Sequence, residues 1–220
     1  MAERKAKKSK STKRRGAEAA LERRIVDTAL DLAEEAGWDA LRLRRVAGRL
    51  GVPLDEVLEH YRDLDAVADA WFRRAWAAML APPPADFATR PARERLHLMT
   101  MRWFDTLAPH RVVTGQMLAA KLYPSHPHHW MPLVFNLSRS IHWLREAALL
   151  DATGRRRQIE EVGLTALFLA TLTCWLRDDT PDQTRTRKFL QRRLDDADRL
   201  MVRAWGRAPP PGIPIDPDLP

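Results

Sequence analysis

The sequence predicts an all-α protein with a small N-terminal domain of three to four helices and a larger C-terminal helical bundle. Apolar residues recur at three- and four-residue intervals along most of the chain, and no segment has the strict alternation of a half-buried strand. Glycine is scarce, at 9 of 220 residues. Pro82, Pro83 and Pro84 stop any helix and stiffen the chain, so we place the boundary between the two domains there.

The first domain, residues 17–80, is expected to contain four helices. An apolar stripe that includes Leu21 and Ile25 predicts a helix over 18–36, and Gly37 stands where a C-terminal cap is expected. The other three helices are expected over residues 41–50, 54–61 and 64–80.

Residues 41–61 have the arrangement of a helix-turn-helix. A short helix, a turn at Gly51 and a second short helix pack across each other, so that the N-terminal part of the second helix faces the major groove of DNA. Val46, Ala47 and Val57 stand where such a pair needs apolar contacts. Any compact helical domain can contain such a corner, so the spacing alone does not establish DNA binding.

The second domain, residues 85–205, is expected to dimerise and to hold any ligand. Its helices are expected near residues 91–108, 111–122, 131–150, 155–177 and 182–205. The run VGLTALFLATLTCWL at 162–176 is apolar on nearly every face, so it must be buried against several helices or against a second copy of the chain. It is shorter than the roughly 20 residues that span a bilayer, so we expect no stable membrane insertion.

Both ends of the chain are expected to be disordered. Residues 2–16 hold eight Lys or Arg against the single acid Glu3, so they carry +7 of the net charge of +8 and leave +1 for the rest. We expect residues 1–16 to form a basic tail that follows an anionic polymer such as DNA, or a solvated tail without a partner. Residues 206–220 contain too many prolines to fold, so we expect this segment to be extended.

Cysteine usage indicates a reducing compartment. Cys174 is the single cysteine, which excludes a disulfide within the chain, and the basic tail has no apolar core of the kind that a secretory signal needs. We therefore expect a cytoplasmic protein in which Cys174 is a small core residue.

The sequence contains no arrangement typical of an enzyme. It has no phosphate-binding loop, no dinucleotide fingerprint, and no nucleophile placed with a base. His126, His128 and His129 cluster between prolines without a nearby acid or second cysteine, so we interpret them as a polar loop and not as a zinc site. We expect no catalytic activity, no metal and no cofactor.

Aromatic and sulfur-containing side chains are spread over the helices of the second domain. Most of them are expected to be core, but several tryptophans around one cavity would suit a flat or lipidic ligand. The candidate ligand-binding residues are Trp103, Phe104, Met117, Trp130, Trp143, Phe168 and Trp175.

Residues 20–72 resemble, without a gap, the N-terminal domain of the TetR family of bacterial transcriptional regulators. The resemblance lies in Ala29–Leu30, Gly37, the segment VAGRLGV at Val46–Val52, and Tyr61. It implies a TetR-like fold and a homodimer that binds double-stranded DNA, in most members as a repressor. It also implies a variable C-terminal domain that often binds a small apolar ligand.

The resemblance also implies which positions contact DNA. Carried over by position, these are Arg42, Leu43, Arg44, Arg45, Pro53, Leu54, Asp55, Glu56, Leu58, Glu59, His60 and Tyr61. Pro53, Leu58 and Leu64 depart from the family pattern, and the acids of the second short helix oppose binding to phosphates by charge repulsion. An alternative is that Asp55 and Glu56 cap the N-terminus of that helix instead of facing DNA.

Residues 164–198 resemble the C-terminal region of the lipid-binding accessory proteins of coenzyme Q biosynthesis, which share the TetR fold. The likeness lies in Asp178, Pro181, Asp182, Thr186, Phe189, Leu190, Arg193, Asp196 and Ala197. It implies an alternative function, the binding of an isoprenoid or quinone lipid by a protein with a vestigial helix-turn-helix. Those proteins end in an amphipathic helix, whereas this chain ends in PPPGIPIDPDLP.

Overall fold

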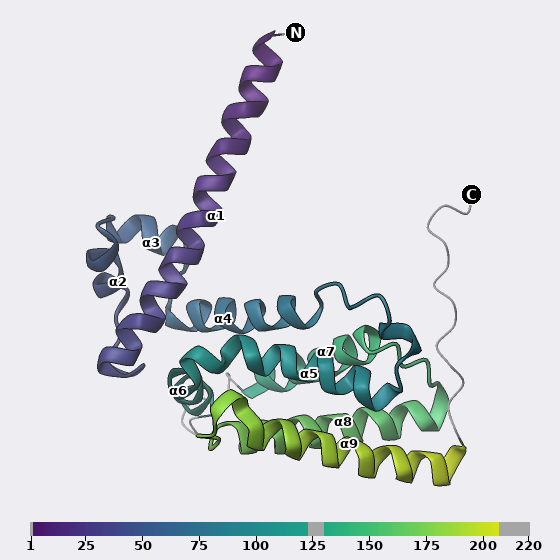
Figure 1. Cartoon of the computed structure of the whole chain (residues 1–220). Helices are drawn as coiled ribbons and strands as arrows, with labels where there is room; N and C mark the ends of the chain where they lie inside the picture. Colours follow the sequence, from purple (N-terminus) through teal and green to yellow (C-terminus); the bar gives the residue numbers. More distant parts are fainter. Residues whose placement is uncertain (1, 123–129, 207–220) are drawn as a thin grey trace. The chain divides into compact units, whose positions relative to one another are not determined.

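The computed structural model describes the backbone of residues 2–122 and 130–206, and the side chains of residues 15–122 and 137–206. All regular structure in these residues is helical, which confirms the predicted all-α class (Figure 1). The chain divides into two compact units, residues 1–74 with 110–120 and residues 75–109 with 121–220.

Unit 1 contains the predicted helix-turn-helix. Its helices are α1 (Ala2–Ala36), α2 (Leu43–Leu50), α3 (Leu54–His60), the first part of α4 (Leu64–Met79), and α6 (Arg111–Lys121) up to Ala120. The core gathers the apolar faces of these helices, with Ile25, Ala29, Val46, Val57 and Val67 fully buried. The predicted bounds of α2, α3 and α4 agree with the structure to within two residues at each end.

The N-terminal segment differs from the expectation of a disordered tail. Helix α1 begins at Ala2 and not near residue 18. Residues 2–15 hold Ala, Lys, Arg and Glu, which favour helix, and no proline, so nothing in this segment stops a helix that propagates from residue 18 toward the N-terminus.

His110 and helix α6, up to Ala120, belong to unit 1, and three polar contacts join them to the rest of that unit. The backbone N–H of Trp38 donates to Oε1 of Gln116 at 2.7 Å, and Nε1 of Trp71 donates to Oγ1 of Thr114 at 2.9 Å. Nδ1 of His110 lies 3.2 Å from Oε1 of Glu34. The division between the units therefore falls within α4 and around α6, and differs from the expected boundary at 82–84.

Unit 2 is a bundle of longer helices. It contains the rest of α4, the 3-10 turn Phe87–Thr89, α5 (Ala92–Leu107), α7 (Trp130–Ala147), α8 (Gly154–Trp175), the 3-10 turn Pro181–Gln183, and α9 (Thr184–Trp205). Helix α8 packs along α9, and α5 packs against both α7 and α9. Gly154 begins α8 with a φ of 60°, a conformation that side-chain-bearing residues rarely adopt.

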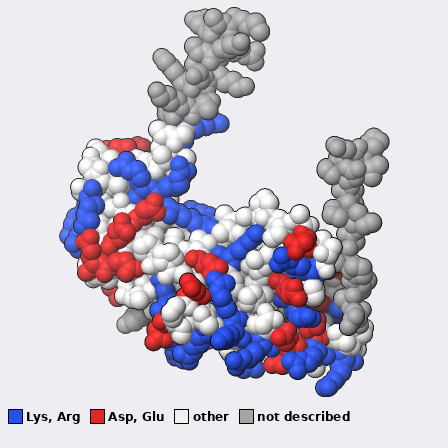
Figure 2. Space-filling model, viewed as in Figure 1, with Lys and Arg blue, Asp and Glu red and all other residues white. Residues whose placement is uncertain are grey.

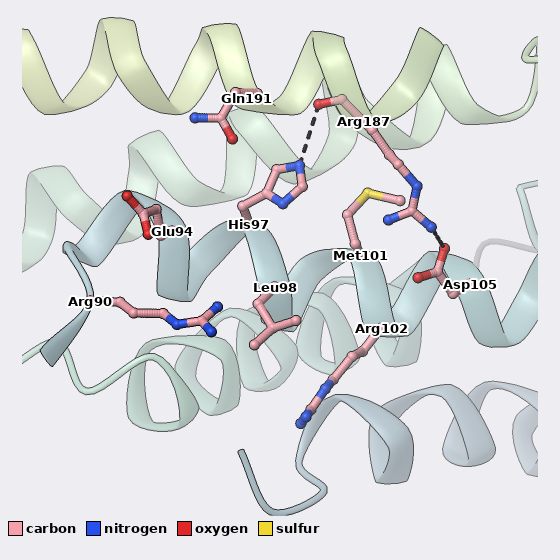
Figure 3. A pocket seen from close by; sticks show the side chains of 9 residues that line it. All are labelled: Arg90, Glu94, His97, Leu98, Met101, Arg102, Asp105, Arg187 and Gln191. Atoms are coloured by element: carbon pink, nitrogen blue, oxygen red, sulfur yellow. Dashed lines mark hydrogen bonds and ion pairs between the residues drawn. The ribbon is translucent and has the colours of Figure 1, made fainter. Parts of the chain in front are cut away.

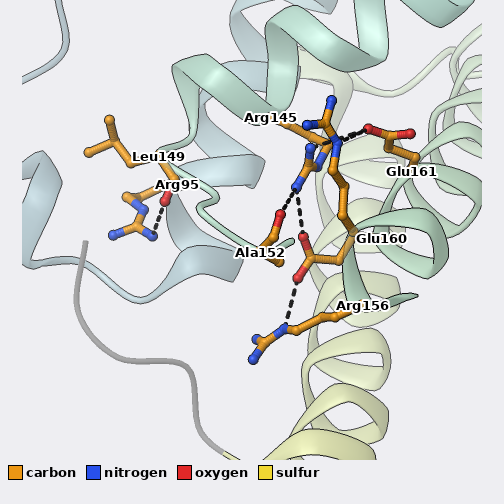
Figure 4. A network of polar contacts seen from close by, with 8 residues as sticks. Arg95, Arg145, Leu149, Ala152, Arg156, Glu160 and Glu161 are labelled. Atoms are coloured by element: carbon orange, nitrogen blue, oxygen red, sulfur yellow. Dashed lines mark hydrogen bonds and ion pairs between the residues drawn. The ribbon is translucent and has the colours of Figure 1, made fainter. Parts of the chain in front are cut away.

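A buried arginine connects α7 to α8 (Figure 4). Arg145 is 1% exposed, and its guanidinium donates to Glu161 Oε1 at 3.3 Å, to Glu160 Oε2 at 3.2 Å and to the Ala152 carbonyl at 3.2 Å. Arg156 also donates to Glu160, at 3.1 Å. One cation thus holds two acids of α8 and the connection that precedes them.

Replacing Arg145 with methionine should lower the free energy of unfolding by about 3 kcal/mol, because removing one partner of a buried ion pair leaves the other without compensation. Urea unfolding followed by circular dichroism measures this loss. The control is Arg139→Met, at an exposed position of the same helix. Equal unfolding free energies for the two variants would show that the buried pairs contribute nothing.

Candidate functional site

The helix-turn-helix corner is closed by backbone geometry at Gly51. This residue has a φ of 69° and follows α2 as its left-handed C-cap, and the N–H of Val52 donates to the Ala47 carbonyl at 3.1 Å. Buried Ala47 and Val57 belong to α2 and α3, which pack together. The corner predicted from the sequence is therefore confirmed as a backbone arrangement.

The outward face of α3 presents two leucines and two acids. Leu54 and Leu58 lie one turn apart and are 42% and 43% exposed. Asp55 and Glu59, also one turn apart, are exposed beside them. This face can contact thymine methyl groups with its leucines and accept hydrogen bonds from cytosine amino groups with its acids.

The basic residues of the corner come from α2. Arg44 and Arg45 are exposed in its first turn, whereas Leu43 is half-buried. Arg42 precedes the helix and folds back, because its Nη1 donates to the carbonyls of Asp39 and Leu41 at 2.8 and 2.6 Å. Arg44 and Arg45 are therefore the predicted arginines without such backbone contacts among the described residues. Figure 2 shows basic and acidic side chains side by side on the molecular surface.

The N-terminus of α3 agrees with the capping alternative for one acid. Pro53 is exposed and occupies the N-cap position, where it offers no side-chain acceptor. Oδ1 of Asp55 accepts the backbone N–H of Glu56 at 3.0 Å, and Glu56 itself is half-buried. The partial positive charge of the helix N-terminus favours both acids in this first turn.

Two of the predicted DNA-contacting residues point away from the exposed face. His60 is directed toward α1, with Nδ1 3.4 Å from Oε1 of Glu22. Tyr61 is 7% exposed and its hydroxyl donates to the Glu22 carbonyl at 3.4 Å. Burial and the nearby Glu22 carboxylate raise the pKa of Tyr61. In this structure both side chains therefore contact Glu22 of α1.

Most of the predicted ligand-binding residues form a packed aromatic core in unit 2. Neighbouring rings have centroids 5.0–6.2 Å apart, the separation of rings in direct contact, and Trp76 of α4 joins the cluster. The predicted members are Trp103, Phe104, Trp143, Phe168 and Trp175. Met117 is buried in α6 of unit 1, and the side chain of Trp130 lies outside the described residues, as do His126, His128 and His129.

A cavity of about 220 Å³ lies beside this core, between α5 and α9 (Figure 3). His97 lies at its centre, with Nε2 3.4 Å from the Arg187 carbonyl, and burial lowers the pKa of this imidazole. The cations that line the cavity already have partners. Arg187 pairs with Asp105, Arg90 pairs with Asp86 at 2.8 Å, and Arg102 donates to the Ala81 carbonyl at 2.7 Å. These contacts connect α5, α9 and the segment before α5. They give each of the three arginines that line the cavity a partner within the protein.

Comparisons with known proteins identify relatives of both the whole chain and its last two helices. The chain is 41% identical to the protein in the crystal structure of the TetR transcriptional regulator from Nitrosomonas europaea ATCC 19718, with a TM-score of 0.73 over 81% of this chain and 98% of that one. The chain belongs to the TetR family. The model of the COQ9 family matches residues 161–201, and a comparison with curated proteins found no match.

Among the described residues of this TetR-family chain, no helix is both long enough and apolar enough to cross a membrane. No group of three or more His, Cys, Asp or Glu side chains in that part of the chain is placed to hold a metal ion.

The segment matched by the COQ9 model contains the corner between α8 and α9, where Asp178 is fully buried. Oδ2 of Asp178 accepts the N–H and the hydroxyl of Thr186 at 2.7 and 2.6 Å, and Oδ1 accepts those of Thr180 at 3.0 and 2.5 Å. Burial opposes ionisation, but these hydrogen bonds outweigh it and lower the pKa of Asp178 to about 2. Two of the residues that carry the resemblance to the coenzyme Q accessory proteins, Asp178 and Thr186, therefore have a structural role at this corner.

Asp178 should stabilise the fold only while it is ionised. Its pKa falls from 3.8 to about 2 on folding, so the ionised group contributes about 2 kcal/mol above the unfolded pKa, and this contribution is lost as the pH falls through the folded value. Asp178→Asn should therefore be less stable than wild type at pH 7, and the difference should narrow between about pH 4 and pH 2. Thermal unfolding across this range measures it, with the exposed neighbour variant Asp179→Asn as control. A difference that does not vary with pH would contradict the assigned pKa.

Proposed function

We propose that this TetR-family protein is a DNA-binding transcriptional regulator, a homodimeric repressor that responds to an apolar ligand. The observation that carries the proposal is the 41% identity, over 81% of the chain, to a protein described as a TetR transcriptional regulator. The closed helix-turn-helix with an exposed α3 supports it, because such a helix presents its outward side chains to the major groove.

The proposed DNA contacts divide into phosphate contacts and base contacts. Arg44 and Arg45 of α2 are available for phosphate oxygens or guanine, and the basic segment 2–16 adds sequence-independent attraction. Leu58 and Glu59 are the residues of α3 proposed to read thymine methyl and cytosine amino groups. The other proposed contacts are Arg42, Leu43, Pro53, Leu54, Asp55 and Glu56.

The proposed dimer uses the outward face of α8. Ile159, Val162 and Leu169 are 47%, 71% and 44% exposed, and their spacing places them along one side of the helix. A second copy of the chain would cover this stripe, and its two-fold symmetry would match a palindromic operator.

Arg44→Ala should weaken binding to DNA taken from upstream of the protein's own gene by about 1–3 kcal/mol, because a bidentate contact to guanine would be lost. Electrophoretic retardation at fixed salt measures this affinity. The matched control is Arg139→Ala, which removes an exposed arginine from unit 2. Wild type that does not retard the upstream DNA, or equal affinities of the two variants, would contradict the proposal.

Deletion of residues 2–16 should reduce the salt dependence of DNA binding. These residues carry +7, so full engagement corresponds to about six released counterions, at roughly 0.9 per neutralised phosphate. The slope of log affinity against log salt should become shallower by up to that amount, with sequence preference retained. An unchanged slope would remove this segment from the mechanism.

A second function, the binding of an isoprenoid or quinone lipid, is supported by the COQ9 model that matches residues 161–201. Organic extraction of the purified protein followed by mass spectrometry tests it. A bound isoprenoid together with no retardation of upstream DNA would favour this function over transcriptional regulation. DNA retardation that responds to an apolar ligand would favour regulation.

A further inference from the structure

Helix α1 continues without a break from the core of unit 1 into the basic segment at the N-terminus. The helix has 35 residues, and the first buried side chain among residues 15–36 is that of Ile25. Arg15, Gly16 and Ala17 are exposed. Figure 1 shows α1 as one helix whose N-terminal part extends beyond α3. We call residues 2–16 the basic arm.

The basic arm begins close to the end of α3, the helix that we propose for the major groove. The imidazole of His60 and the hydroxyl of Tyr61 each lie 3.4 Å from an oxygen of Glu22 in α1. Gly16 precedes Glu22 by six residues, which correspond to about 9 Å along the axis of an α-helix. A duplex that contacts α3 therefore lies close to the base of the arm.

The basic arm carries a charge that opposes its own helical conformation. Eight Lys or Arg and one Glu give its 15 residues a net charge of +7. Many of these cations have another cation three or four positions away, as Lys10 has in Lys7, Lys13 and Arg14, and such pairs destabilise a helix. A polyanion beside the arm would neutralise this repulsion and so favour the helical state.

The composition of the basic arm favours a nucleic acid over a membrane surface. Ala2 and Ala6 are its only apolar residues, so the arm has no apolar face of the kind that an interfacial helix buries in a bilayer. Ser9, Ser11 and Thr12 add hydroxyl groups, which are common donors to phosphate oxygens of DNA. The phosphates of a duplex are therefore the polyanion that this composition fits.

We propose that the basic arm binds, as a helix continuous with α1, the phosphates of duplex DNA that flanks the segment read by α3. Fifteen residues of α-helix span about 22 Å, which is the rise of about six or seven base pairs. The arm extends the contact with DNA outward by up to that length. The position of the flanking DNA rests on the proposed regulator function, whereas contacts to phosphates are independent of base sequence.

Gly16 offers a pair of variants that change the helix and leave the charge at +7. It is the single glycine of α1, and a Cβ added there meets no heavy atom within 4 Å outside the adjacent helix backbone. Gly16→Ala therefore favours a continuous helix, by about fivefold in the local equilibrium. Gly16→Pro interrupts the helix, because proline lacks the N–H and its ring clashes with the preceding turn. The packed part of α1 tolerates this proline at its first turn.

Affinities of the full-length variants for three duplexes test the arm at fixed salt. The first is the shortest upstream duplex that wild type retards, and the second extends it at each end by about seven base pairs of flanking sequence. The third is a random-sequence duplex as long as the second. Hydrogen exchange followed by mass spectrometry reports the amides of residues 2–16 with and without DNA, and with anionic phosphatidylglycerol vesicles. Thermal unfolding checks that both variants retain the fold.

We expect wild type and Gly16→Ala to bind the extended duplex more tightly than the short one. Gly16→Pro should bind the extended and random duplexes at least about fivefold more weakly than Gly16→Ala, because the helical arm is lost. DNA should slow amide exchange in residues 2–16 of wild type and Gly16→Ala.

Equal affinities of Gly16→Ala and Gly16→Pro for the extended and random duplexes would overturn the helical arm and leave a flexible charged segment. Slower exchange on vesicles but not on DNA would also overturn it, in favour of a membrane surface. A different result would contradict the regulator function alone: no preference for upstream over random DNA, while the two Gly16 variants still differ on the random duplex.

Discussion

Burial of Val57 determines which side chains of α3 face outward. Helix α3 has seven residues, and Val57 is the residue that is buried in the core of unit 1. Two turns of helix with one inward residue leave little rotational freedom, so Leu54, Leu58 and their acidic neighbours face outward. The same constraint turns the last turn of α3 back toward α1, where His60 meets Glu22.

Hydrophobic periodicity was sufficient to predict the helices, because each helix buries one stripe. The bounds of α2, α3 and α4 follow from residues such as Val46, Val57 and Val67, whose burial is dictated locally. The N-terminal segment was less predictable, because charge composition indicates disorder while Lys, Arg and Ala also favour helix. The assignment of α6 to unit 1 depends on Gln116 meeting Trp38, 78 positions away, and no local pattern encodes that contact.

At the candidate sites, too, local sequence patterns could not predict contacts between residues that are far apart in the chain. The positions of Arg44 and Leu58 followed from the resemblance, but the inward direction of Tyr61 depends on its contact with α1. For the second domain, composition could show that aromatic residues were numerous but not that they contact each other. The aromatic residues fill the space between the helices with rings in direct contact.

The match to the COQ9 model does not by itself favour lipid binding over transcriptional regulation. It covers most of α8, most of α9 and the corner between them, and at that corner Thr180 and Thr186 donate hydrogen bonds to Asp178. Such a corner positions two helices and serves any function that the fold carries. The residues that can separate the two functions lie outside the match, on the exposed face of α3. If α3 approaches DNA as we propose, the carboxylates of Asp55 and Glu59 would oppose contact with phosphates and so lower the affinity for arbitrary DNA. A sequence that offers cytosine amino groups would recover part of that cost, so the acids of α3 are compatible with a regulator that discriminates strongly between DNA sequences.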